Sequence, residues 1–141
     1  MTTLADNEVR KYEASGVDSY GDQPAVAADI VYEGAAVGDN GSGYGRPLVA
    51  ADPFLGFATR KCDNSDGAAG DLYIRVMERG YAVLAVTGVT GPGDVGDDVY
   101  ATDDNTFTKT SSGASAIGTI ERHISGTTCV VYFESVTVRS I

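Results

Sequence analysis

The sequence DLYIRVMERGYAVLAV, residues 71–86, decides the fold class of this chain. In its first half Leu72, Ile74 and Val76 alternate with Tyr73 and Arg75. This period-two pattern is typical of a β-strand with one face turned towards a core. The sequence therefore predicts a strand that ends near residue 77.

The second half of the same stretch predicts a return strand. Glu78, Arg79 and Gly80 have the length and composition of a hairpin loop, with a glycine that can adopt the positive φ of its last position. Residues 81–86 are a nearly continuous apolar run, too short for a helix. We expect a hairpin here, with residues 81–86 as a central strand buried on both faces.

The composition extends this prediction to the whole chain. The 141 residues include 18 glycines and 8 tyrosines, and no long segment has helical periodicity. Apolar runs recur at strand length between glycine-rich turns, from residue 29 to the end of the chain. We predict one all-β domain, a small antiparallel β-barrel or sandwich spanning residues 29–141.

Residues 1–28 have a different character and predict an extended N-terminal arm. Their apolar residues follow no steady period, so we expect the segment to bury little area against its own domain. Either it is a frayed terminus or it becomes ordered on a partner. The spaced apolar anchors are Val9, Tyr12, Val17, Tyr20 and Val26.

The charge excludes some partner classes. The formal net charge is −10, from twenty acidic and ten basic residues, whereas binding nucleic acid requires a surplus of Lys and Arg. No apolar run approaches the length of a membrane span, and the N-terminus lacks the apolar core of a signal peptide. We expect no nucleic-acid partner and no membrane partner.

Three polar stretches resemble ligand loops, and in each a structural interpretation is favoured. Residues 38–45 are glycine-rich but lack the Gly-Lys-Ser/Thr ending of a phosphate loop. Residues 63–67 begin like a calcium loop but lack its later bidentate acid. Five aspartates between Asp94 and Asp104 fit turns better than a metal site. We expect no metal and no cofactor.

The sequence offers no catalytic set. His123 is the only histidine, and it stands in an expected strand without a nucleophile motif nearby. Cys62 and Cys129 lie far apart and have no metal-ligand spacing, so we expect two buried free thiols. The chain is not expected to be an enzyme.

Several short motifs, in this order and spacing, resemble the capsid cement or head decoration proteins of tailed bacteriophages. Each motif is common, but together they cover most of the chain. They are Arg10-Lys11-Tyr12-Glu13, residues 30–38 (IVYEGAAVG), 54–58 (FLGFA), 63–64 (DN), 67–71 (GAAGD), the segment around Gly80, 95–101 (VGDDVYA) and 117–120 (IGTI).

The resemblance implies a β-tulip-like body and a structural role in the virion. Such a protein is made in the bacterial cytoplasm, binds the outer surface of the expanded major capsid protein lattice and braces the head against internal DNA pressure. Its implied partners are the major capsid protein and neighbouring decoration protomers, with a trimer favoured and a dimer possible. The arm would then be the capsid-binding element, with candidate contact residues Val9, Arg10, Tyr12, Val17 and Tyr20.

The main alternative is a calcium- or carbohydrate-binding β module of the adhesin type, indicated by the aspartate-rich loops and the tyrosines. An enzyme that uses tyrosine and carboxylate groups comes third.

Overall fold

The computed structural model describes residues 3–138, so residues 1–2 of the expected arm and 139–141 of the expected β domain lie outside it. The described chain is all-β, as the sequence predicts, with one short 3₁₀ turn at Pro92–Asp94. Its strands are β1 (Tyr12–Glu13), β2 (Ser19–Pro24), β3 (Asp29–Val31), β4 (Ala36–Asp39), β5 (Gly45–Pro47), β6 (Phe54–Ala58), β7 (Cys62–Asn64), β8 (Tyr73–Thr87), β9 (Asp98–Asp103), β10 (Thr106–Thr108), β11 (Ser115–Ser125) and β12 (Thr128–Glu134).

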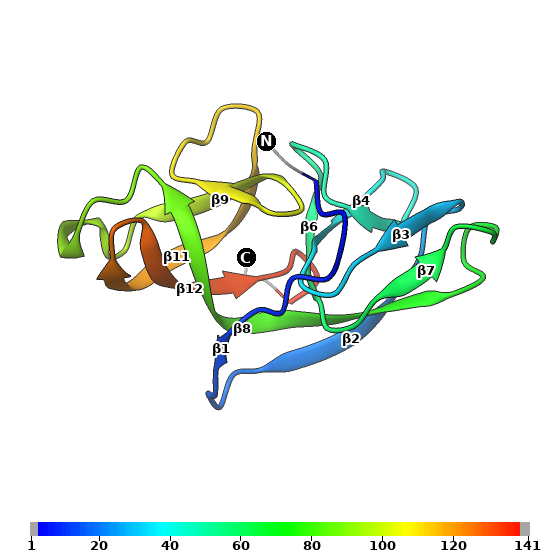
Figure 1. Ribbon diagram of the computed structural model, residues 1–141, viewed down its shortest axis with the longest axis horizontal. Coiled ribbons are helices and arrows are strands. Elements are labelled where there is room, and N and C mark those ends of the chain that lie inside the picture. Colours follow the sequence, from blue (N-terminus) through cyan, green and yellow to red (C-terminus); the bar gives the residue numbers. More distant parts are fainter. Residues whose placement is uncertain (1–2, 139–141) are drawn as a thin grey trace.

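One half of the molecule is a closed five-stranded barrel (Figure 1). Its strands follow the order β8-β12-β11-β9-β10, and β10 closes the ring by pairing with the end of β8 in parallel. The other pairings around this ring are antiparallel. A buried cluster that includes Phe57, Leu84, Phe107, Ile117 and Phe133 forms its core.

The other half is a second group of strands built on the first part of β8. There β8 pairs with β2 on one side and with β6 on the other, and β4 and β5 continue the sheet from β6. A bridge between Ala25 and Gly45 joins the end of β2 to β5, and β3 and β7 form a separate two-stranded ribbon. A second buried cluster, which includes Val37, Ile74 and Val76, fills this half.

The expected hairpin at residues 78–80 is wrong, because β8 runs without interruption through both halves. Gly80 is not among the residues with positive φ. A Cβ atom at Gly80 would lie 2.9 Å from the Met77 sulfur, so this glycine provides space rather than a turn. Glu78 accepts a hydrogen bond from the backbone N–H of Ser135, and Arg79 Nε donates to the Val17 carbonyl. The polar residues that suggested a loop mark the place where β8 changes partners.

The expectation that residues 81–86 are buried on both faces is also wrong, because half-buried or exposed residues alternate with buried ones along this part of β8. Other strand predictions hold with adjusted bounds. The expected strand at residues 29–37 is two strands, β3 and β4, separated by a turn at Gly34, where φ is +86°. The C-terminal run ends as a strand at Glu134. Cys62 and Cys129 are buried free thiols, as expected, one in each apolar cluster.

The barrel core should be the main source of stability. Leu84 is 2% exposed within it, so Leu84→Ala should lower the free energy of unfolding by about 2–5 kcal/mol by leaving a cavity. Urea unfolding of both proteins measures the change. As a control, Val95→Ala should change the free energy of unfolding little, because the Val95 side chain is 50% exposed. Equal losses of unfolding free energy in the two variants would contradict the burial of Leu84 in the barrel core.

Candidate functional site

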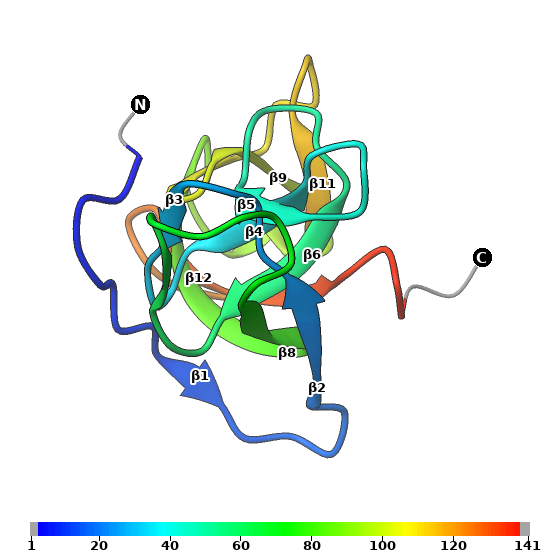
Figure 2. The same ribbon diagram turned by 90° about the vertical axis from the view of Figure 1, so that its right-hand side faces the viewer.

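The N-terminal segment lies along the outside of the β body, joined to it by hydrogen bonds (Figures 1 and 2). We call residues 4–13 the strap. Its Glu8 N–H donates to the Glu33 carbonyl, and its Lys11 carbonyl accepts from the Val83 N–H. The segment thus packs against its own domain although it buries little area: residues 5–9 and 11 are exposed, and none of residues 4–13 is fully buried. Backbone hydrogen bonds and the half-buried Arg10 side chain hold it there.

Arg10 is the centre of the strap. Its guanidinium carbon lies 5.4 Å from the Phe57 ring centroid and 5.3 Å from that of Phe107, so the cation rests against two core aromatics. Its Nε donates to the Gly34 carbonyl at 2.8 Å, and Nη2 donates to Asn105 Oδ1 at 2.7 Å. Arg10 thus links the β3–β4 turn to the β9–β10 turn.

Gly34 allows the strap to cross this turn closely. A Cβ atom there would lie 1.8 Å from the Glu8 carbonyl oxygen, and φ is +86°, which side chains rarely adopt. The path of the strap therefore depends on this glycine as well as on Arg10.

Tyr12 is also used within the molecule. Its ring lies 6.3 Å from that of Phe133, and it packs against the barrel core from β1. Burial raises the pKa of the Tyr12 hydroxyl, which is enclosed without a hydrogen-bond partner among the described residues. Arg10 and Tyr12 are thus intramolecular contacts of the strap.

The five candidate residues differ in exposure. Val9 is 76% exposed on the strap, and Tyr20 is 47% exposed on β2. Val17 is half-buried, and its carbonyl accepts from Arg79. Of the five, only Val9 and Tyr20 are therefore largely exposed. The sequence could not separate them from the other three, whose partners lie far away in the chain.

Asp104 holds the start of the strap and was not a candidate from sequence. It is fully buried, its Oδ1 accepts from the Leu4 N–H at 3.0 Å, and its Oδ2 has no partner among the described residues. Burial raises the pKa of Asp104 to about 6, Asp103 adds to this, and the Leu4 N–H and the Arg10 charge oppose it. The only signal in the sequence was the pair of adjacent aspartates, which turns also explain.

Three of the remaining aspartates of this stretch serve a turn or a lysine: Asp103 accepts from the Asn105 N–H, and Asp94 and Asp97 bind Lys109. Lys109 Nζ contacts the carboxylates of Asp94 and Asp97, and Asp94 also accepts from the N–H groups of Thr90 and Gly91. The Lys109 contact and these backbone donors hold the pKa of Asp94 well below its usual range. Within residues 3–138 no group of three or more His, Cys, Asp or Glu side chains is arranged to hold a metal ion.

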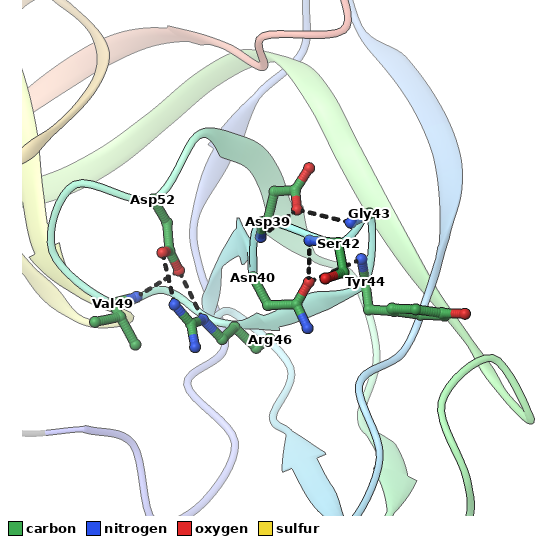
Figure 3. Close-up of polar contacts among 9 residues, drawn as sticks. Asp39, Asn40, Ser42, Gly43, Tyr44, Arg46, Val49 and Asp52 are labelled. Carbon is green, nitrogen blue, oxygen red and sulfur yellow. Dashed lines mark hydrogen bonds and ion pairs between the residues drawn. The ribbon is translucent and has the colours of Figure 1, made fainter.

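The glycine-rich loop between β4 and β5 is closed by its own side chains (Figure 3). Asp39 Oδ1 accepts from the N–H groups of Gly41 and Gly43, and Asn40 Oδ1 accepts from those of Ser42 and Tyr44. A phosphate group would need these donors. Their internal use favours the structural interpretation of the loop.

An ion pair fixes the next loop in the same region (Figure 3). Asp52 accepts two hydrogen bonds from Arg46, at 3.0 and 2.9 Å, and a third from the Val49 N–H. The geometry is bidentate and one partner is buried, so this pair holds the loop between β5 and β6.

A pocket of about 220 Å³ lies on the barrel wall, beside β9 and β11. Its lining includes Tyr100, Asp98, Thr119 and Glu134, and the Tyr100 hydroxyl lies 3.5 Å from Asp98 Oδ2. His123 lies elsewhere on β11, with Nε2 3.0 Å from the Gly126 carbonyl oxygen. An aromatic ring beside carboxylate and hydroxyl oxygens can bind a polar small molecule.

No helix among the described residues has both the length and the apolar character needed to cross a bilayer.

The burial of the Asp104 carboxyl group should make stability depend on pH. Because its pKa is raised in the folded state, its contribution is fully present below the unfolded value of about 4 and is lost as pH rises through about 6. Asp104→Asn should therefore gain about 1 kcal/mol relative to the wild type between pH 5 and pH 7.5. Urea unfolding at both pH values measures this.

The exposed Asp66 provides the control, since Asp66→Asn should show no such difference between the two pH values. A stability difference between wild type and Asp104→Asn that stays constant with pH would contradict the assignment.

No protein-family model matches the sequence, and a search of curated proteins finds no match. Among solved structures, the fold is similar to a chain of the structure titled "The capsid of Myoviridae Phage XM1". The TM-score is 0.54 at 19% sequence identity, and the match covers 91% of this chain and 91% of that chain. The two chains therefore share a fold along nearly their whole length.

Proposed function

We propose that this chain is a structural virion protein that binds the outer surface of an expanded major capsid protein lattice. In this role it stabilises the phage head against internal DNA pressure. The protein acts at the virion surface as a capsid cement, or head decoration, protein after synthesis in the bacterial cytoplasm.

The shared fold with a chain of a phage capsid structure carries this proposal. The match includes both halves of the molecule, since it covers 91% of each chain. The order of sequence motifs from residue 10 to residue 120 supports the same family independently. Fold alone does not define a function, so the surface properties must fit the role as well.

The surface properties support a binding role rather than chemistry. Over the described residues the loops at 38–45 and 63–67 use their side-chain oxygens for their own backbone and hydroxyl groups, and Asp94 and Asp97 bind Lys109. The net charge of −10 disfavours contact with packaged DNA and favours a partner with basic groups. A rigid β body with internally satisfied loops suits a clamp on a protein shell.

The partners follow from this role. The first is the major capsid protein, and neighbouring copies of this chain are the second, as a trimer in preference to a dimer. We propose that the exposed parts of residues 3–28 contribute to attachment. Arg10 and Tyr12 act indirectly, by fixing the strap from which Val9 projects.

Carbohydrate binding is the second candidate function, favoured by the pocket at Tyr100. Sugar rings stack on aromatic side chains, and their hydroxyl groups donate to carboxylates such as Asp98. Binding of the wild type, and not of Tyr100→Ala, on a glycan array would support this candidate.

The main experiment mixes the purified chain with expanded heads of its phage that lack it. We expect saturable binding at lattice sites and heads that withstand higher temperature before they release DNA. Unexpanded heads serve as the control, because their surface lattice differs. Absence of saturable binding to expanded heads would contradict the proposal.

The strap contribution has its own test at Val9. Val9→Ser should weaken head binding several-fold and leave the melting temperature unchanged, because this exposed side chain contributes little to folding. Val95→Ser, at another exposed valine, is the matched control and should bind like the wild type. Equal occupancy of heads by all three proteins would remove Val9 from the contact surface.

A further inference from the structure

Strand β2 is an edge strand of the structure. It pairs with β8 on one side from Ser19 to Pro24, and no strand within residues 3–138 pairs with its other side along that length. Figure 1 shows β2 at the outer boundary of the molecule, beyond β8. An edge strand presents unpaired backbone donors and acceptors to any extended chain beside it.

The side chains along this edge alternate in a regular way. Asp18, Tyr20 and Asp22 are exposed, whereas the residues between them are half-buried against the body. Tyr20 is 47% exposed and the Asp22 side chain 52%. The edge therefore shows a row of two carboxylates with an aromatic ring between them.

Contacts with two different parts of the chain hold the row in place. Asp18, just before β2, accepts a hydrogen bond from Ser15 Oγ, whereas Tyr20 and Asp22 contact the neighbouring strand. The Arg75 guanidinium carbon lies 5.6 Å from the Tyr20 ring centroid, and its Nη1 lies 3.5 Å from Asp22 Oδ1. Tyr73 on β8, opposite Pro24, adds a second exposed ring to this face. The edge is thus a preorganised surface, which lowers the entropy cost of binding.

The charge of the row decides which kind of strand fits. A symmetric antiparallel pairing of two β2 strands about Tyr20 would place Asp18 of each copy opposite Asp22 of the other. Like charges directly opposite each other are destabilising, and both copies carry a net charge of −10. In the same antiparallel arrangement, a partner strand with basic residues opposite Asp18 and Asp22 forms favourable pairs of opposite charge.

We propose that the open edge of β2 pairs with an extended segment of a capsid-shell subunit that carries Lys or Arg at alternate positions around an apolar residue. The apolar residue packs on Tyr20, and the basic residues lie opposite Asp18 and Asp22. This inference rests on the proposed function and specifies the contact surface and the chemistry of its partner.

The test compares charge variants of the full chain on expanded heads that lack it. Asp18→Lys/Asp22→Lys reverses the row, and Asp66→Lys/Glu121→Lys makes the same change of net charge at two exposed carboxylates away from β2. We expect the first variant to bind about tenfold more weakly or worse, and the second to bind like the wild type. The wild type should also lose affinity with added salt more steeply than the β2 variant.

Each outcome separates the inference from the proposed function. Equal binding by both folded variants overturns the β2 contact, whereas failure of the wild type to bind contradicts the function itself. If the Lys variant melts lower than the wild type, Asp18→Asn/Asp22→Asn replaces it, because asparagine keeps the shape and an acceptor oxygen. Wild-type affinity of that folded neutral variant at low salt also overturns the inference.

Discussion

The pairing of one strand, β8, with two different sets of neighbours is the constraint on which the rest of the structure depends. From Tyr73 to Met77 it supports the half filled by the second apolar cluster, and beyond Arg79 it forms one wall of the closed barrel. Because both cores share this strand, neither half can close without it. The change of partners occurs at Glu78, Arg79 and Gly80. There the Arg79 side chain donates a hydrogen bond to the Val17 carbonyl, and a Cβ atom at position 80 would crowd the Met77 sulfur.

The strap is the second link between the two halves. Arg10 contacts Phe57 and Phe107 and donates to groups in two separate turns. A half-buried guanidinium needs partners for its donors and compensation for its charge, here supplied by carbonyl and amide oxygens and by aromatic faces. The N-terminal segment is therefore part of the folded unit, and any role in attachment belongs to what it exposes.

Local patterns in the sequence predicted the fold class and many strands, because alternation and glycine turns are local properties. Asp98 to Asp103 and the run from Cys129 illustrate this. The same reasoning failed at Glu78-Arg79-Gly80, where polar residues inside a long strand have the composition of a loop. It also failed for the strap, because the partners of Arg10 and Tyr12 lie far away in the chain. The roles of Asp104 and of the β2 edge depend likewise on long-range pairing, so no local pattern could reveal them.

The strap and the β2 edge together define how this molecule would meet a capsid: as a rigid body that keeps its N-terminal segment on its own barrel and offers an open strand edge. A cryo-electron microscopy map of expanded heads bound to the full chain tests this most directly. The account predicts density on the outer surface, with Arg10 against Phe57 of the same chain and β2 within hydrogen-bond distance of a shell strand. A map in which the strap has left its own barrel, or in which β2 faces solvent, would contradict it.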